Sequence, residues 1–436
     1  MTLNRTTSSP TRSTTRSARR RRGLALAAVT ALVASLTAAC GGGEDDSADG
    51  AVELSIATFN EFGYEELIEE WNAENPDIQV TQRKVANWDE AKDNLYTKLA
   101  ANSGLSDIEA VEGDAMRAIL AESGAFVDLA DPAVEGRWYD FVETQATDDE
   151  GQLIGYGTDI GPEGICYRAD LFEEAGLPSD RAEVAELMGT WEDYYATGEQ
   201  FVAAMPDTAW YDSSGSIGQA MINQIEYPFE NADGEIDVEN PELEAVWETV
   251  TSNSEAGLST RLAQWNDDWT ASFQNDGHAT MPCPGWMLGI VEGNAAGVEG
   301  WDFADVFPGG AGNWGGSFLV VPAQSEHPEE AQQFAEWITR PEQQLRAYEA
   351  KGPFPSQPEA LGDPILTEGT NPFFNDAPTG QILSNRAEAL TMQPFKGVHY
   401  PDVLAAFQAA LLRVDDGSNT PEESWETFVS DASALG

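Results

Sequence analysis

VELSIATF, at residues 52–59, places apolar side chains at alternating positions, which is the two-residue period of a half-buried β-strand. Residues 65–75 follow with Leu67, Ile68 and Trp71 on one helical face, and Pro76 ends this predicted helix. The same order continues along the chain, with strands expected at 78–80 and 108–111 and helices at 88–101 and 115–122. A βαβαβα order predicts an α/β lobe with a mostly parallel sheet.

The rest of the chain alternates in a similar way. Strand segments are expected at 152–159, 164–167 and 317–321, and helices at 169–175, 191–204, 216–225, 241–253, 328–338, 341–351, 401–412 and 421–435. Roughly 385 residues follow residue 50, which is more than one hydrophobic core usually serves, so two lobes are expected.

Residues 231–237, NADGEID, admit two interpretations. They resemble part of a calcium loop, but with Gly234 as the loop glycine the first ligand would be Phe229, which carries no oxygen in its side chain. A hairpin turn on Asp233-Gly234 is the favoured interpretation.

The N-terminus is typical of an exported protein. Four arginines at 19–22 precede an apolar run at 23–36 and the small residues before Cys40. This order predicts a signal peptide over 1–39, lipid attachment at Cys40, and a flexible tether over 40–50. An anchoring helix with an incidental Cys is the alternative. Thr37 stands where such signals usually carry Leu, and the arginine run leaves general and twin-arginine export both open. The expected location is the extracellular face of the membrane.

The charge of the chain excludes several partners. The formal net charge is −54, and the part after Cys40 carries 15 basic against 76 acidic residues, a formal charge of −61. Such a surface repels nucleic acid and anionic lipid headgroups. It fits adaptation to a saline medium or a generally acidic lineage. Disorder does not explain it, because 13 Trp, 18 Phe and 11 Tyr can supply a substantial core.

Signals for catalysis are sparse. The three histidines lie far apart without metal-ligand spacing, and no nucleophile elbow, P-loop or dinucleotide fingerprint stands in a suitable context. No metal and no cofactor are expected. Any carboxylate pair could be drawn as a hydrolase dyad, but among 76 acidic residues such a pair carries little information.

Two cysteines remain after the proposed lipid site. Outside the cytoplasm, Cys166 and Cys283 are expected to form a disulfide, while their apolar neighbours leave two buried free thiols as the alternative.

Tryptophans flanked by Gly and Pro are the strongest binding signal. Trp286, Trp301 and Trp314 stand in such contexts, which leave an indole few sequence neighbours to bury it. An indole face suits the apolar face of a sugar ring, while the hydroxyls of a sugar need polar partners. We expect at least one of these three in a cleft, and we expect Trp71, Trp247 and Trp337 in the core.

Several motifs together resemble a known family. GICYRADLFEEAGLP at 164–178, PCPGWMLG at 282–289 and DVFPGGAGNWGGS at 305–317 are similar to extracellular solute-binding protein family 1, the sugar-binding lipoproteins of ABC importers. ATFNEF at 57–62, EGD at 112–114, WYDSSGSIGQAMINQIEYPFE at 210–230 and HPEEAQQFAEWITRPEQQ at 327–344 support the resemblance, which covers the whole mature chain. The motifs look closest to the actinobacterial binders of cellobiose and cello-oligosaccharides.

The resemblance implies an α/β, two-lobe periplasmic-binding-protein-like fold of type II, hinged, with the ligand in the cleft between lobes. It places lobe one at 51–161 plus 317–350 and lobe two at 162–316 plus 351–436. Carried over position by position, and completed from local context at Trp88, Tyr211 and Asp212, the implied ligand-binding residues are Asn60, Glu61, Trp88, Asp114, Asp159, Glu163, Tyr211, Asp212, Trp286, Trp314 and Phe354.

The function implied is capture of an oligosaccharide for ABC permease subunits by a monomer held at the outer leaflet through its lipid. No bond of the ligand is broken and no nucleic acid is bound. Cellobiose leads, with chitobiose, maltose and xylobiose as other sugars. An extracellular glycoside hydrolase and an acidic surface adhesin without an enclosed pocket are the alternatives from other classes.

Overall fold

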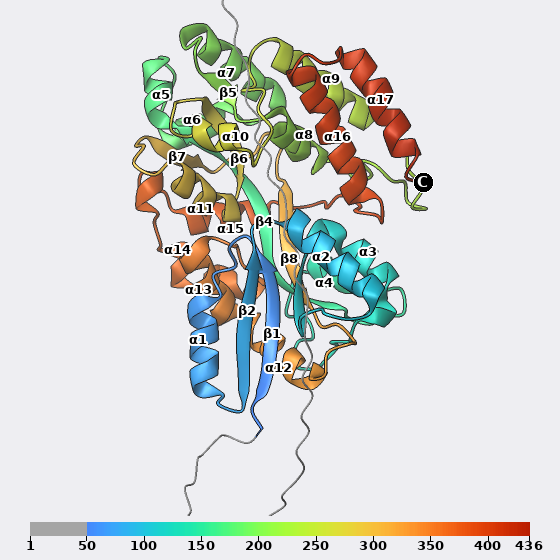
Figure 1. Ribbon diagram of the computed structural model, residues 1–436. Helices are drawn as coiled ribbons and strands as arrows, with labels where there is room; N and C mark the ends of the chain where they lie inside the picture. Colours follow the sequence, from blue (N-terminus) through green and yellow to red (C-terminus); the bar gives the residue numbers. More distant parts are fainter. Residues whose placement is uncertain (1–49) are drawn as a thin grey trace, which may run out of the picture. The chain divides into compact units, whose positions relative to one another are not determined.

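The computed structural model describes residues 50–436 (Figure 1). The predictions for the signal peptide, Cys40 and nearly all of the tether fall on 1–49 and lie outside the described residues. Over 50–436, no helix is long and apolar enough to cross a bilayer.

The strands form one connected path in the order β2-β1-β3-β8-β4-β6-β5, with β7 paired to β4. β1 is parallel to β2 and β3, as the opening βαβαβα pattern predicted, but the β3–β8, β8–β4, β4–β6 and β4–β7 pairs are antiparallel. β5 and β6 are also parallel, so the expectation of a mostly parallel sheet is right for the first three strands and for this pair, and wrong for every pair that involves β4 or β8. The bounds are β1 (Val52–Phe59), β2 (Ile78–Val85), β3 (Ile108–Glu112), β4 (Gly155–Arg168), β5 (Ala209–Tyr211), β6 (His278–Pro284), β7 (Trp301–Ala304) and β8 (Asn313–Val320).

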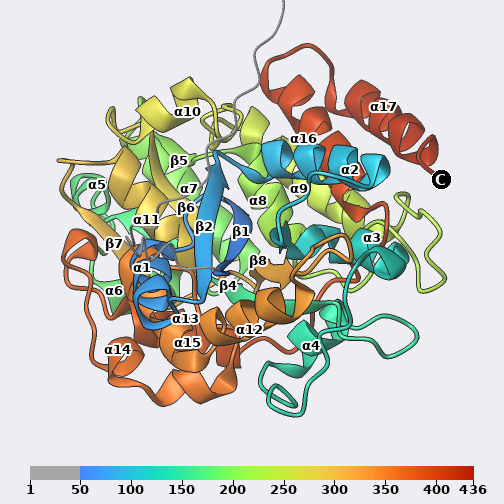
Figure 2. The ribbon, with the colours of Figure 1, turned by 60° about the horizontal axis from the view of Figure 1, so that its bottom comes forward.

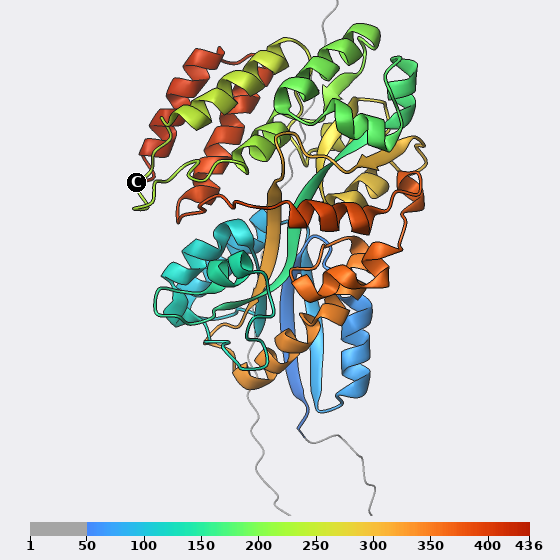
Figure 3. The ribbon, with the colours of Figure 1, turned by 180° about the vertical axis from the view of Figure 1, so that it is seen from behind.

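β4 joins two groups of strands. Its first part, to Pro162, pairs with β8, and from Glu163 onward it pairs with β6 and β7. At Gly161, a Cβ would lie 1.8 Å from the carbonyl oxygen of Trp314, so only glycine allows β4 and β8 to approach this closely. The segment predicted at 152–159 from residue 155 onward and the segment predicted at 164–167 thus belong to one continuous strand, which runs through the middle of the ribbon in Figures 1 and 3.

Helices cover both groups of strands (Figures 1 and 2). The predicted bounds of the helices at 88–101, 191–204, 328–338 and 341–351 are confirmed. Caps explain several starts: Asn87 accepts a hydrogen bond from the Glu90 amide, and Thr420 and Glu423 form a capping box. The bounds near β1 to β3 are α1 (Glu65–Glu74), α2 (Trp88–Ala101), η1 (Gly113–Ala115), α3 (Met116–Ala121), η2 (Ser123–Ala125), α4 (Asp140–Ala146), α12 (Pro328–Ile338) and α13 (Pro341–Lys351).

The remaining helices follow β4 in the chain. They are α5 (Ala169–Glu174), α6 (Arg181–Leu187), α7 (Trp191–Ala204), α8 (Ser214–Ile222), α9 (Pro241–Glu255), α10 (Asp267–Ser272), α11 (Gly285–Asn294), η3 (Pro358–Gly362), α14 (Pro364–Thr367), η4 (Pro372–Phe374), α15 (Thr379–Glu388), α16 (Tyr400–Asp415) and α17 (Pro421–Ser433).

The buried apolar residues form two clusters. One is built on β1, β3 and β8 and includes Trp71, and the other lies among α7, α8, α9, α16 and α17 and includes Trp247. Trp337 is partly buried against the first cluster. The first cluster also takes in residues of β6, β7, α11 and α15, so the two clusters do not divide at the boundaries proposed for the lobes, and these boundaries stay a prediction.

A disulfide links the neighbouring strands β4 and β6. Cys166 and Cys283 are joined with an S–S distance of 2.06 Å, and 117 positions separate them in the chain. The interpretation as two free thiols does not hold in this structure.

Residues 231–237 form the expected turn. Glu230 pairs with Ile236 as an antiparallel bridge, and Gly234 takes a φ of +78°, which glycine adopts without strain. Within 50–436, no group of three or more His, Cys, Asp or Glu side chains is arranged to hold a metal ion.

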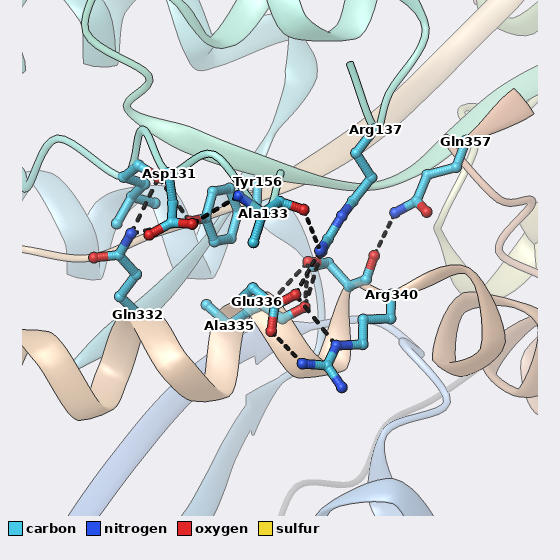
Figure 4. Close-up of polar contacts among 11 residues, drawn as sticks. Asp131, Ala133, Arg137, Tyr156, Gln332, Ala335, Glu336, Arg340 and Gln357 are labelled. Carbon is cyan, nitrogen blue, oxygen red and sulfur yellow. Dashed lines mark hydrogen bonds and ion pairs between the residues drawn. The ribbon is translucent and has the colours of Figure 1, made fainter. Parts of the chain in front are cut away.

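A polar network of Arg137, Glu336 and Arg340 connects the segment before α4 to α12. Arg137 Nη2 donates to Glu336 Oε1 at 2.5 Å, and Arg340 Nη2 donates to Glu336 Oε2 at 2.7 Å (Figure 4). Burial acts to raise the pKa of Glu336, but hydrogen bonds from the two guanidinium groups lower it overall. None of these three residues lines the cavity described next.

Candidate functional site

A cavity of about 930 Å³ lies beside the middle of β4. One wall comes from the loop after β1, the start of α2, the end of β3 and the start of β8. The other comes from the start of α8, the loop before α10, α11 and α16. Seven of the eleven predicted ligand-binding residues line it: Asn60, Glu61, Trp88, Asp114, Asp159, Trp286 and Trp314.

The loop after β1 brings the first polar groups to the cavity. Asn60 takes a left-handed backbone with φ of 47°, which turns the chain directly after the strand. The Glu61 carboxylate accepts a hydrogen bond from Lys84 at 2.8 Å and lies 3.6 Å from Lys351. The charge of Glu61 is therefore balanced within the protein.

The end of β3 contributes two carboxyl groups. Asp114, in η1, is buried and forms an ion pair with the equally buried Lys396 of the segment before α16. Desolvation, followed by the negative charge of Asp114, raises the pKa of Glu112 to about 8. Burial thus favours the protonated form of Glu112, and a protonated carboxyl group can donate as well as accept a hydrogen bond.

Asp159 adds a third carboxyl group from β4. Burial raises its pKa to about 7, although the Thr158 hydroxyl donates a hydrogen bond to Oδ1 at 2.7 Å. Thus the floor of the cavity holds one charge-balanced carboxylate and two carboxyl groups that titrate near or above neutrality.

Indoles form the apolar surface. Trp286 is the second residue of α11, after Gly285, where a Cβ would lie 2.9 Å from the Gly352 carbonyl oxygen. Trp286 Nε1 donates to the Trp314 carbonyl at 3.0 Å, and the two rings meet edge to face at 5.5 Å. With its N–H satisfied, Trp286 presents an apolar ring to the cavity.

The sequence also singled out Trp88 and Trp301, and only Trp88 lines the cavity. Trp88 lines the cavity and packs on Phe59 with ring centroids 5.3 Å apart. Trp301 does not line it: this residue is 1% exposed and packs on Phe273 in the core. Neighbouring glycines therefore did not predict exposure in this case.

Four predicted residues lie outside the cavity lining: Glu163, Tyr211, Asp212 and Phe354. Glu163 follows the point where β4 leaves β8, and its Oε2 accepts only from Asn223, at 3.2 Å. Burial raises the pKa of Glu163 to about 8. Phe354 is fully buried, and its carbonyl accepts a hydrogen bond from the Ile160 amide. Glu163 is thus part of β4, and Phe354 is hydrogen-bonded to it.

Tyr211 ends β5 and Asp212 follows it, and both residues are buried. The Asp212 carboxylate accepts hydrogen bonds from Ser216, Gln264 and Trp269, so it ties α8 to the loop before α10. Desolvation raises the pKa of Asp212 to about 6, against these three bonds. Asp212 therefore positions a loop of the cavity without lining the cavity itself.

Trp265 and Lys396 are the main residues that sequence reasoning missed. Trp265 lines the cavity next to Trp286, yet no glycine or proline flanks it. Lys396 lies far from Asp114 in the chain, and no motif marks it. Lysine is scarce in so acidic a chain, and Lys84, Lys92 and Lys351 line this cavity, but Lys396 does not, so scarcity alone would not have singled it out.

Comparisons with known proteins agree with this architecture. The sequence profile described as bacterial extracellular solute-binding protein matches residues 66–373. The arabinooligosaccharide-binding protein of Bacillus subtilis (strain 168) is 26% identical over 322 residues, which cover 70% of this chain and 72% of that protein.

Solved structures share the fold. A crystal structure of an extracellular solute-binding protein family 1 member is 45% identical, with a TM-score of 0.80 over 87% of this chain and 98% of that one. An ABC-transporter-associated binding protein from B. animalis subsp. lactis, in complex with β-1,6-galactobiose, is 19% identical with a TM-score of 0.75 over 88% of this chain and 97% of that one. The expected α/β fold of two-lobe binding proteins is thus confirmed.

Proposed function

The chain belongs to the bacterial extracellular solute-binding protein family, and from this premise we propose that it captures a neutral oligosaccharide for an ABC importer. Cellobiose or a short cello-oligosaccharide is the ligand proposed first, and membrane permease subunits receive it. We also propose that Cys40 carries the lipid anchor, that the protein works as a monomer at the extracellular face of the membrane, and that the lobes divide at the boundaries given above.

The observation that carries the proposal is the pairing of indole faces with carboxyl groups in one cavity. Trp88 and Trp286 are partly exposed and offer apolar ring surface, and the buried Trp314 packs on Trp286. Asp114, Asp159 and Glu112 offer oxygen partners close by. A pyranose ring has apolar C–H faces and polar hydroxyl edges, so it can satisfy both kinds of surface together.

The charge balance of the cavity favours an uncharged ligand. Lys84 and Lys351 pair with Glu61, Lys396 pairs with Asp114, and Lys92 lies 3.9 Å from Asp89. Among residues 50–436, each lysine at the cavity therefore already has a carboxylate partner, and an acidic sugar would have to break such a pair.

Binding requires no chemistry on the sugar. A ligand that contacts both walls of the cavity binds the closed conformation, in which the walls are close together, better than the open one. Binding therefore shifts the population of the protein toward the closed conformation. The closed form would then dock on the permease.

Calorimetric titration of the mature protein at low and high salt tests the proposal. The panel includes cellobiose, cellotriose, cellotetraose, chitobiose, maltose and xylobiose, and the relatives add an arabino-oligosaccharide and β-1,6-galactobiose. We expect saturable binding of at least one neutral oligosaccharide, and a ligand at about 100 times its Kd should stabilise the fold by about 2.7 kcal/mol. If no sugar binds at either salt concentration, the proposal is wrong.

A glycoside hydrolase remains the alternative to test, because carboxyl groups line the cavity. The same sugars incubated with excess protein should release no reducing ends under the proposed function. Release that disappears in an Asp159→Asn variant would instead assign a hydrolytic role to this carboxyl group.

A further inference from the structure

Trp265 combines exposure with an unfavourable backbone. Its side chain is 52% exposed, the largest exposed fraction among the exposed large apolar residues of the described chain. Its φ is +71°, in the left-handed region that bulky residues rarely adopt. A large apolar surface in water and a strained backbone both cost free energy, so this position favours neither folding nor solubility.

The surrounding contacts hold Trp265 in place from both sides. Gln264 Nε2 and Trp269 Nε1 both donate to Asp212 Oδ2, at 3.0 and 2.9 Å. Asn266 caps α10 by accepting from the Trp269 amide at 2.7 Å. The residues before and after Trp265 are thus fixed by a buried carboxylate and by a helix start, which together hold the backbone at Trp265 in its left-handed conformation.

The indole is aligned with the apolar surface of the cavity. Its ring centroid lies 6.2 Å from that of Trp286 with an angle of 27° between planes, and it packs on Trp269 at 5.1 Å. Trp265, Trp286 and Trp314 all line the same cavity. The apolar surface therefore continues from the partly buried Trp286 to the half-exposed Trp265, toward the opening.

We propose that Trp265 provides a ring-stacking subsite at the opening of the cavity, and that it makes the protein select chains longer than a disaccharide. The inference rests on the proposed oligosaccharide function and adds chain length to it. The volume of about 930 Å³ is near the upper end of the usual range for ligand cavities, which leaves room for additional sugar rings beyond a disaccharide.

The test compares two ligands and two substitutions. Trp265→Ala removes the indole and keeps a Cβ in the left-handed region, whereas Trp265→Gly removes the indole and also the strain. Calorimetry with cellobiose and cellotetraose measures affinity, and thermal unfolding measures the fold. Tyr227→Ala is the matched control, because Tyr227 is 38% exposed and does not line the cavity.

In both Trp265 variants we expect cellotetraose affinity to fall about tenfold while cellobiose affinity changes less than about twofold. Trp265→Gly should unfold at a temperature no lower than Trp265→Ala, and both should unfold close to the temperature of the unchanged protein, so that the lost affinity is not a loss of fold. Tyr227→Ala should leave both affinities unchanged.

Equal affinities of the Trp265 variants and the unchanged protein for cellotetraose would overturn the subsite. An equal loss for both sugars would overturn the selection by chain length. If the unchanged protein binds neither these sugars nor any other oligosaccharide of the panel, the proposed function fails and this inference fails with it.

Discussion

Replacement of Glu163 by Gln should change how the stability of the protein depends on pH. Glu163 is fully buried on β4, its Oε2 accepts one hydrogen bond from Asn223, and its Oε1 has no hydrogen-bond partner. Burial raises the pKa of this carboxyl group from 4.5 to about 8, against the Asn223 bond and the charge of Lys396. The native protein therefore holds a proton that the unfolded chain releases above about pH 4.5.

The number of protons bound in the folded and the unfolded state sets the direction in which stability changes with pH. Between about pH 4.5 and pH 8 the folded state binds one more proton than the unfolded state at this site, so the free energy of unfolding falls as pH rises. Each pKa unit corresponds to about 1.4 kcal/mol, which sets the full contribution at no more than about 5 kcal/mol. Below pH 4.5 and above pH 8 the contribution is constant.

Glutamine has nearly the same shape and does not titrate. We expect the Glu163→Gln variant to gain stability relative to the unchanged protein as pH rises from 5 to 9, by several kcal/mol and at most about 5. Guanidinium unfolding at intervals of half a pH unit measures the difference. Glu299→Gln, a change of an exposed carboxyl group, is the matched control and should run parallel to the unchanged protein.

Parallel curves for Glu163→Gln and the unchanged protein across this range would refute the reasoning. They would show that Glu163 is as ionised in the folded state as in the unfolded one, and hence that water or a cation reaches it.

Other predictions follow from the same structure. Trp286→Ala should weaken sugar affinity by about 1–3 kcal/mol in calorimetry with little change in unfolding temperature, and unchanged affinity would place its ring outside the ligand contact. Lys396→Met leaves the buried Asp114 unpaired and should cost about 3–5 kcal/mol in denaturant unfolding, whereas Asp114→Asn in the same chain should recover much of that loss; no recovery would contradict the ion-pair explanation. The double variant Cys166→Ser, Cys283→Ser removes a disulfide that spans 117 positions and should lower the free energy of unfolding by about 2–5 kcal/mol. The prediction is wrong if the unchanged protein is equally stable before and after its disulfide is reduced.

Local signals carried the prediction of the elements and of the family. The alternation at 52–59 and the apolar stripe at 328–338 fix one face of a strand and one face of a helix, and both elements have the predicted bounds. These patterns depend on neighbours within a few positions, so they are readable without the rest of the fold. Motifs such as 167–178 also pointed to the family, whose profile matches the chain.

The parts of the site that depend on one segment were also accessible. Asn60 and Asp114 follow strands whose carboxyl ends meet at one edge of a parallel sheet, and both line the cavity. Trp286 is the second residue of a helix after a strand, where the chain turns sharply. For these residues, position along an element was enough to place the side chain.

The other features of the site depend on contacts between segments that lie far apart in the chain. Asp212 and Phe354 have the chemistry of ligand contacts, but other elements cover them, and burial depends on which segments pack on a residue. Trp265 owes its exposure to a left-handed turn held by Asp212 from a distant strand end, and Lys396 finds Asp114 from 282 positions away. Such contacts arise only when the whole chain has folded, since a side chain's sequence neighbours do not specify which distant groups will surround it.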